Sequence, residues 1–310
     1  MKIMNITKSI LMLITAAWIM SSCGEASVDV KNESYEPRIV IEGFLIAGQR
    51  NVKMLFTKNF RVDEGFTNLD IFLDLETTEA SVTCLDDGKV YELSFIVVQE
   101  RDEVKEAYWG YQGSDFLVEP GKTYQLNVSA VVEGQNLSAS SITKVPPAGF
   151  KITHFNHDSL VYWQKDENGN VLNFEITFDL SADTDFYMAA IQALNPTLKT
   201  FIYDNPYGDV EEEDIDLDDD AYKNAAAFNL DPSIGYGKLK LEWYDFSFYD
   251  DYRIVMFATD QNYREFLVSF SNVMEIDGNF HEAKFNIEGQ GIGIFGSMIA
   301  DTVYCKVLDK

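Results

Sequence analysis

The chain has 310 residues, of which 46% are apolar and 14% aromatic, so a disordered acidic tail, which would be poor in aromatic residues, is excluded. Its 51 acidic and 24 basic side chains give a formal net charge of −27, which argues against a nucleic-acid-binding protein and against electrostatic docking on anionic lipid. The length suggests about two domains of ordinary size, each able to bury its own core.

Residues 1–22 have the features of a lipoprotein signal peptide. Lys2 and Lys8 come before an apolar run that ends at Met20 and is too short to span a bilayer, which takes about 20 apolar residues. The run leads into Met20-Ser21-Ser22-Cys23, which resembles the bacterial lipobox, where the cysteine is acylated and becomes the mature N-terminus. We therefore expect Cys23 to carry a lipid anchor, which is stable when more than one acyl chain is attached. The alternative is an ordinary signal peptide with a chance cysteine.

Residues 23–36 are polar and lack periodicity, which predicts a short flexible tether. Over residues 37–147, apolar and polar side chains alternate as in half-buried β-strands. The apolar positions of these runs are Val52, Met54 and Phe56; Val82 and Cys84; Tyr91, Leu93, Phe95 and Val97; and Tyr124, Leu126, Val128 and Ala130. Asp86-Asp87-Gly88 between two such runs is a strong hairpin signal. The pattern predicts a small β-sandwich over residues 37–147.

The segment Val145-Pro146-Pro147-Ala148-Gly149 interrupts the strand pattern and marks an expected domain junction. We expect residues 150–310 to form a second β-rich domain. Its predicted strands are Leu172–Leu180, Phe186–Ala193, Lys199–Tyr203, Leu239–Trp243 and Tyr252–Thr259, with three more near Lys284–Ile287, Ile292–Phe295 and Val303–Val307. One amphipathic helix is predicted from the helical spacing of Tyr263, Phe266, Leu267, Phe270 and Met274, with Thr259 or Asp260 as its N-cap.

Two cysteines remain besides Cys23. Export would place the protein in an oxidising compartment, which permits a disulfide between Cys84 and Cys305. Each of them, however, lies on the apolar side of a strand pattern, and free cysteine commonly behaves as a small core residue. We therefore favour two buried free thiols.

A glycine motif near the C-terminus imitates a nucleotide-binding fingerprint. Gly291-Ile292-Gly293-Ile294-Phe295-Gly296 matches G-x-G-x-x-G, but that fingerprint needs a following helix and a later acidic residue within a βαβ unit. The remaining residues read as a strand, so we reject nucleotide binding. We expect a Gly-rich strand against which another backbone packs closely.

The segment from Asp209 to Asp220 is mostly acidic. Asp214, Asp216 and Asp218 imitate the first ligands of a calcium loop, but Asp219 and Ala225 occupy the places that need Gly and a bidentate Glu. The segment is therefore not an EF-hand. Loose divalent binding is the alternative to a solvated, partly disordered loop, which we favour because blocks of like charge repel and extend.

Catalytic signatures are weak. His154 and His157, with Asp158, have a spacing that metals sometimes use, but in a strand the two imidazoles point to opposite faces, and only His281 could add a third. No G-x-S-x-G motif is present. Paired carboxylates for glycoside hydrolysis cannot be recognised among so many acids.

Two aromatic clusters are candidate binding surfaces. One contains Trp109 and Tyr111, and the other contains Trp243 and Tyr244. Aromatic residues fall on both faces of any strand there, so some of them could meet a sugar or a protein partner. The alternative, which we favour, is that the core and a neighbouring domain cover both faces.

Several segments together resemble one family. They are the lipobox, Pro37–Gly43, Pro120–Tyr124, and the C-terminal stretch from Asn286 to Gly296. The chain resembles a family of lipoproteins of unknown function widespread in Bacteroidota, domain of unknown function 4249. The resemblance implies an outer-membrane lipoprotein with an Ig-like N-terminal β-sandwich and a gene that often neighbours a TonB-dependent transporter. It carries over no catalytic residue.

The sequence therefore predicts a lipid-anchored, mostly β accessory protein that is not an enzyme. We expect it at the outer membrane, on the periplasmic or cell-surface face, where it would hold a TonB-dependent transporter or a nutrient ligand. No cofactor and no nucleic-acid partner are expected. The alternatives are a secreted, lipid-anchored hydrolase that uses carboxylates or the His154/His157 region, and a structural, adhesin-type surface lipoprotein.

Overall fold

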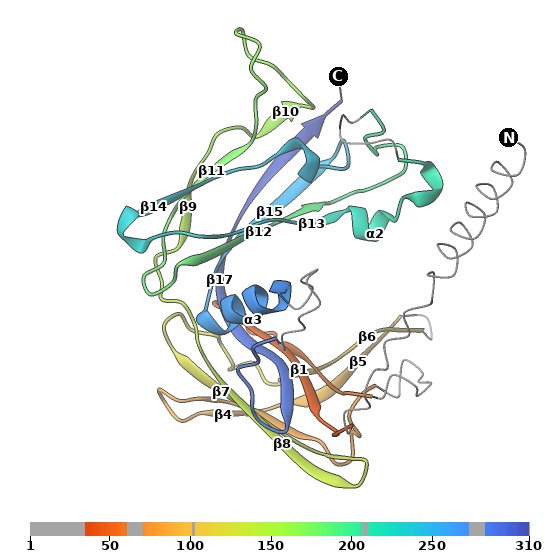
Figure 1. The fold of residues 1–310 in the computed structure, drawn as a ribbon, viewed down its shortest axis with the longest axis vertical. Coiled ribbons are helices and arrows are strands. Elements are labelled where there is room, and N and C mark those ends of the chain that lie inside the picture. The colour runs from red at the N-terminus through yellow and green to blue at the C-terminus, as the bar shows by residue number, and fades with distance from the viewer. Residues whose placement is uncertain are drawn as a thin grey trace, which may run out of the picture. The chain divides into compact units, whose positions relative to one another are not determined.

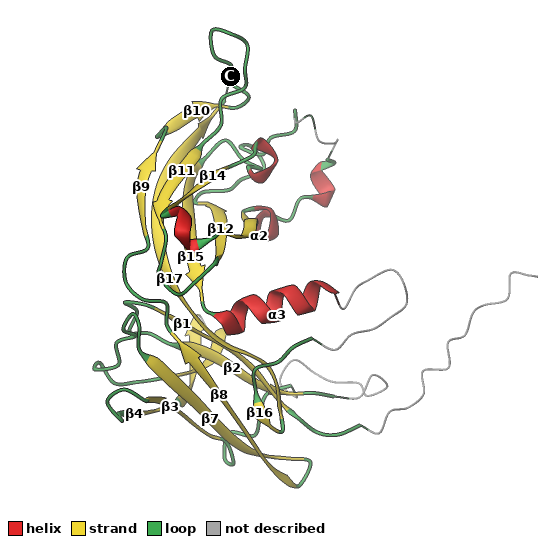
Figure 2. Cartoon of the chain, turned by 60° about the vertical axis from the view of Figure 1, so that its left-hand side comes forward, coloured by secondary structure: helices red, strands yellow, loops and turns green. Residues whose placement is uncertain are grey.

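The computed structural model describes residues 35–60, 71–100, 103–204, 206, 210–272 and 283–309. Cys23, the expected signal peptide and most of the expected tether lie outside these ranges. The described part is mostly β, as the sequence predicts, with few helices (Figures 1 and 2). None of the helices in these ranges is long and apolar enough to cross a membrane.

The described strands form three sheets. Sheet A has nine of them, in the order β13 (Tyr222–Asn229), β12 (Phe186–Ala193), β15 (Asp251–Thr259), β17 (Gly291–Leu308), β1 (Ile39–Ile46), β2 (Lys53–Lys58), β6 (Glu103–Gly110) and β5 (Ser94–Glu100), with β10 (Ser159–Val161) paired to β17. Sheet B has the order β16 (Glu288–Gly289), β8 (Gln135–Lys144), β7 (Thr123–Val132), β3 (Glu79–Cys84) and β4 (Val90–Glu92). Sheet C has the order β14 (Tyr236–Lys240), β11 (Glu175–Asp179) and β9 (Lys151–Phe155).

The helical elements within the described ranges are short. They are α2 (Leu217–Asp220), α3 (Gln261–Asn272) and three 3₁₀ turns at Glu212–Asp214, Pro232–Ile234 and Trp243–Asp245.

Strand β17 belongs to both halves of sheet A. Its first part, Gly291–Met298, pairs in parallel with β1. Its second part, Met298–Lys306, pairs antiparallel with β15, and Figure 1 shows the strand continuing between the two regions. The pairings of this one strand therefore connect the first and last parts of the chain.

Two hydrophobic clusters divide near the expected junction. The first holds residues from Ile39 to Val145 between sheet B and the β1–β2–β6 side of sheet A. The second begins at Phe150 and lies between sheet C and the β12–β15 side. Strand β17 contributes to both, with Phe295 in the first cluster and Val307 in the second. Residues Pro37–Lys310 accordingly form one compact unit.

Strand predictions are confirmed where the alternation is regular. Strand β7 has alternating buried apolar and outward polar side chains, and β12 begins and ends where the sequence predicts. The run from Tyr91 to Val97 is not one strand, because the chain leaves sheet B after β4 and enters sheet A at β5.

Other strand predictions are wrong. Lys199–Tyr203 makes only an isolated bridge between Phe201 and Phe248. The strand expected at Leu239–Trp243 is β14, which ends at Lys240, and Trp243 lies in a 3₁₀ turn. Lys284–Ile287 is not a strand, and the two strands expected after it are the single strand β17.

Helix α3 confirms the amphipathic helix that the spacing of the apolar residues predicts. The Asp260 carboxylate accepts a hydrogen bond from the Tyr263 backbone N–H at 3.0 Å, so Asp260 is the N-cap. Tyr263 packs edge-to-face on Phe44 with ring centroids 5.2 Å apart. Phe270 is 53% exposed, so the apolar face is buried mainly near the start of the helix.

The glycine motif has a structural role in sheet A. Gly293 has φ +107, and a Cβ there would collide with the Ile41 carbonyl oxygen of β1. The expected close approach of another backbone is therefore confirmed. Cys84 and Cys305 are buried free thiols, one in each cluster, as expected.

Candidate functional site

The first pair of candidate binding aromatics lies mostly in the core, in line with the alternative that the sequence favours. Trp109 is 4% exposed and packs between Phe56 and Phe95, with ring centroids 5.8 and 5.6 Å away. Tyr111 is partly exposed, and its hydroxyl donates to the Asp115 carboxylate at 2.7 Å. This hydrogen bond raises the pKa of Tyr111. The aromatic surface available to a ligand at this cluster is therefore small.

The second aromatic pair shares a cavity with the acidic segment. This cavity of about 210 Å³ is lined by Trp243, Tyr244 and Asp220, among others. Trp243 is buried, and its indole N–H donates to the Leu172 carbonyl at 2.9 Å. Tyr244 is 53% exposed, and its carbonyl accepts a hydrogen bond from the Lys223 ammonium. The structure thus brings Asp220, Trp243 and Tyr244 together, with Lys223 bound to the wall.

Asp245, which follows Tyr244 in the chain, is a buried acid. Its carboxylate accepts the Glu242 backbone N–H at 3.0 Å and closes the 3₁₀ turn that holds Trp243. Loss of hydration raises the pKa of Asp245 to about 6, while that hydrogen bond and the Lys223 charge act in the opposite direction. The Asp245 carboxylate therefore stabilises the turn.

One of the three candidate metal ligands in the acidic segment is used within the segment itself. The Asp216 carboxylate accepts the backbone N–H groups of Asp218 and Asp219 and caps α2. Asp214 and Asp218 are exposed. Across the described ranges, no group of three or more His, Cys, Asp or Glu residues is placed to hold a metal ion. His154 is exposed on β9, His157 follows that strand, and His281 lies outside the described residues.

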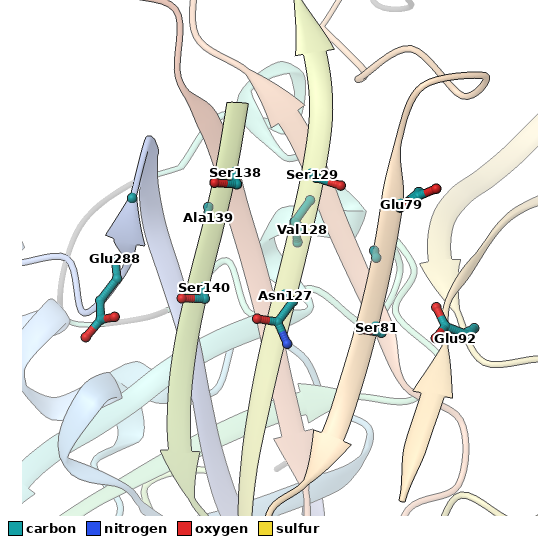
Figure 3. A pocket seen from close by; sticks show the side chains of 12 residues that line it. Glu79, Ser81, Glu92, Asn127, Val128, Ser129, Ser138, Ala139, Ser140 and Glu288 are labelled. Atoms are coloured by element: carbon teal, nitrogen blue, oxygen red, sulfur yellow. The ribbon is translucent and has the colours of Figure 1, made fainter. Parts of the chain in front are cut away.

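The outer face of sheet B carries a group of polar side chains that lie side by side across the strands. Five outward side chains lie in register across its five described strands, and we call them the polar row (Figure 3). The polar row is Glu288, Ser140, Asn127, Ser81 and Glu92, each paired with the next across adjacent strands. Beside it, Glu79, Ser129 and Ser138 form a second, shorter row. Together they line a shallow depression of about 490 Å³.

The depression follows from the alternation of these strands. On β7, Leu126, Val128 and Ala130 point into the core, so Asn127 and Ser129 point outward. The outward side chains in the middle of the sheet are short, whereas the three glutamates stand around them. The result is an open trough with hydroxyl and amide groups at its centre.

Strand β16 completes the row from the far end of the chain. Gln290 donates its backbone N–H to the Ser138 carbonyl at 2.8 Å, and its side-chain oxygen accepts the Ser138 N–H. The Ser141 hydroxyl donates to the Asn286 carbonyl. Gly289, with φ +84, lies where a Cβ would collide with the Ser138 carbonyl oxygen. These contacts fix Glu288 beside Ser140.

Sequence reasoning missed the polar row. Each member looks like the ordinary solvent side of a half-buried strand. The signal that could have found it is the register, because only strand pairing places residue 288 beside residue 140.

The sequence profile of the family described as Domain of unknown function (DUF4249) matches residues 25–302, which is most of the chain. The chain belongs to the DUF4249 family. The family expected from the sequence is therefore confirmed for this DUF4249 chain.

Other comparisons with the DUF4249 chain give only distant likenesses. No curated protein matches it. Salmonella alpha-2-macroglobulin reacted with methylamine matches at 11% identity and TM-score 0.25, covering 89% of this chain and 15% of that one. Three N-terminal domains of the bacteriophage RB49 Highly Immunogenic Outer Capsid protein (Hoc) match at 11% identity and TM-score 0.22, covering 89% of this chain and 71% of that one. Likenesses this low carry no argument about function.

Proposed function

We propose that this chain is a lipid-anchored accessory binding protein of the outer membrane in a member of the Bacteroidota. It would hold a nutrient ligand or a TonB-dependent transporter at the periplasmic or cell-surface face. The observation that carries the proposal is the lipobox-like Met20-Ser21-Ser22-Cys23 after a short apolar run. The mature chain then begins with a tether and continues as the β-rich unit from Pro37 onward.

Two further observations support a binding role. The resemblance to DUF4249 lipoproteins implies a gene that often neighbours a TonB-dependent transporter, and membership of that family is established above. The polar row is also an open surface on a rigid sheet, which suits binding. The proposal assigns no catalytic step to any residue.

Replacement of the anchoring residue tests the proposal. Cys23→Ala should move the protein from the outer-membrane fraction to the soluble fraction and abolish incorporation of labelled fatty acid, because the acyl chains supply the membrane affinity. Ser21→Ala keeps a small residue in the lipobox and should leave both readouts unchanged. Unchanged membrane retention of the Cys23→Ala protein would refute lipidation at Cys23.

A further inference from the structure

The side chains of the polar row are free to meet a ligand. Within the described part of the chain, none of the eight side chains that form the two rows hydrogen-bonds or ion-pairs with another residue. The carboxylates are acceptors, the Asn127 amide both donates and accepts, and each serine hydroxyl does both. A ligand that carries many hydroxyl groups can satisfy all of these at once.

The spacing of the row selects the shape of the ligand. Adjacent strands lie about 4.8 Å apart, so the five side chains from Glu288 to Glu92 extend over roughly 19 Å at right angles to the strands. A pyranose ring in a linear oligosaccharide advances that chain by close to one strand spacing. An extended peptide presents same-side groups only every 6.7 Å or so, and therefore falls out of step with the row.

The charge of the trough selects further. Its lining, as far as the structure describes it, contains three carboxylates, from Glu79, Glu92 and Glu288, and no Lys or Arg. An acidic ligand would be repelled, and an amino-bearing ligand attracted, at low ionic strength. No aromatic side chain lines the trough, so hydrogen bonds rather than ring stacking would provide recognition.

We infer that the polar row binds a linear oligosaccharide that is neutral or bears amino groups, lying across the strands of sheet B. Glu288 and Glu92 would accept hydroxyl or ammonium hydrogens at the two ends, and Asn127 would bind the middle. The inference rests on the proposed function, because it names the ligand class that an anchored accessory protein would capture.

Equilibrium binding of three end-labelled linear hexamers tests it, with the full-length lipidated protein in a detergent that has no sugar headgroup. The probes are a glucose, a glucosamine and a galacturonic acid oligomer. The glucose and glucosamine oligomers should bind, the glucosamine oligomer more tightly at low salt, and the galacturonic acid oligomer should not.

Matched variants locate the site. Asn127→Ala should weaken binding of the glucose oligomer roughly three- to tenfold, the value of one lost hydrogen bond. Gln125→Ala, on the same strand and face but outside the trough, should not. Glu92→Gln should weaken the glucosamine oligomer more than the glucose oligomer. These side chains are outside the core, so the variants should fold.

Three outcomes would overturn the inference: no binding of the glucose and glucosamine oligomers, preference for the galacturonic acid oligomer, or binding that is insensitive to Asn127→Ala. Membrane retention of the same preparation separates this failure from failure of the proposed function. Retention without oligosaccharide binding overturns only the ligand class, whereas a wild-type protein absent from the membrane fraction overturns the proposed function.

Discussion

Asp260 lies in a buried polar cluster between the two halves of the protein. Its side chain is 8% exposed, and one carboxylate oxygen accepts the Tyr263 N–H while the other accepts the Thr143 hydroxyl at 2.5 Å. The Thr143 oxygen also lies 2.7 Å from the Ser297 hydroxyl oxygen. Because Thr143 has one hydroxyl proton, it donates to Asp260 and accepts from Ser297. Strands β8 and β17 are thus joined to the start of α3.

Burial sets the charge state of this cluster. Loss of hydration raises the pKa of Asp260 from its usual 3.8 to about 6, although the hydrogen bonds from Thr143 and the backbone act in the opposite direction. The folded protein therefore binds this proton more tightly than the unfolded chain does. The stabilisation of the folded state by this bound proton is fully present below about pH 4 and is lost as the pH rises through about 6. The difference between the two pKa values corresponds to about 3 kcal/mol.

Asp260→Asn should remove this pH dependence. Asparagine caps helices as well as aspartate does, and its amide carries no charge to desolvate. From pH 4 to pH 7.5, the unfolding free energy of the wild type should therefore fall by about 2 kcal/mol relative to that of the variant, less than the full difference because the unfolded carboxyl is already partly ionised at pH 4. Urea unfolding of both proteins across this pH range measures the difference between their unfolding free energies. Titrating groups that the two proteins share contribute equally to both values and therefore cancel in that difference.

Asp231→Asn is the opposite control. Hydrogen bonds from Ser233 lower the pKa of this exposed acid, so the stability that the Asp231 carboxylate contributes is lost as the pH falls. The unfolding free energy of the wild type relative to that of Asp231→Asn should therefore rise with pH, opposite to the change expected for Asp260→Asn. Parallel pH curves for the wild type and the Asp260→Asn protein, or a wild-type unfolding free energy that rises relative to that of the variant between pH 4 and pH 7.5, would refute the reasoning about Asp260.

Two further predictions concern sheet A and the thiols. Gly293→Ala should lower the unfolding free energy by at least about 2 kcal/mol, because the new methyl group meets the Ile41 carbonyl. Gly48→Ala, in open space at φ +82, should lower it by only about 1 kcal/mol. Equal losses for the two variants in urea titrations would contradict this account. Burial raises the pKa of the Cys84 and Cys305 thiols, so both should react with a maleimide only in denaturant, and fast labelling of the native protein would show that they are accessible.

The sequence predicts the fold best where one face of a strand meets solvent. Strand β7 alternates regularly because sheet B has a wet outer face. Strand β17 does not, because the stretch from Ile294 to Met298 is buried on both faces, and alternation there carries no signal. The sequence therefore predicts two short strands where one long strand, β17, connects both halves.

The candidate site was less accessible to sequence reasoning. Large residues such as Trp109 and Trp243 are the binding candidates that a sequence makes visible. Both are in the core, as the favoured alternative predicts, because aromatic side chains bury much apolar area there. The polar row consists of small residues whose importance depends on register between strands from distant parts of the chain. The local pattern predicts Thr259 or Asp260 as the N-cap, but the hydrogen bond of Asp260 to Thr143, and that of Thr143 to Ser297, follow only from the tertiary fold.

Recovery of membrane partners tests the central claim most directly. The lipidated wild-type protein should be purified from outer membranes in mild detergent, beside the Cys23→Ala protein purified from the soluble fraction. The account predicts that the wild-type protein alone retains an integral outer-membrane protein, a TonB-dependent transporter, in stoichiometric amount. Purification of the membrane-anchored protein without any such partner or bound ligand, across several growth conditions, would contradict it.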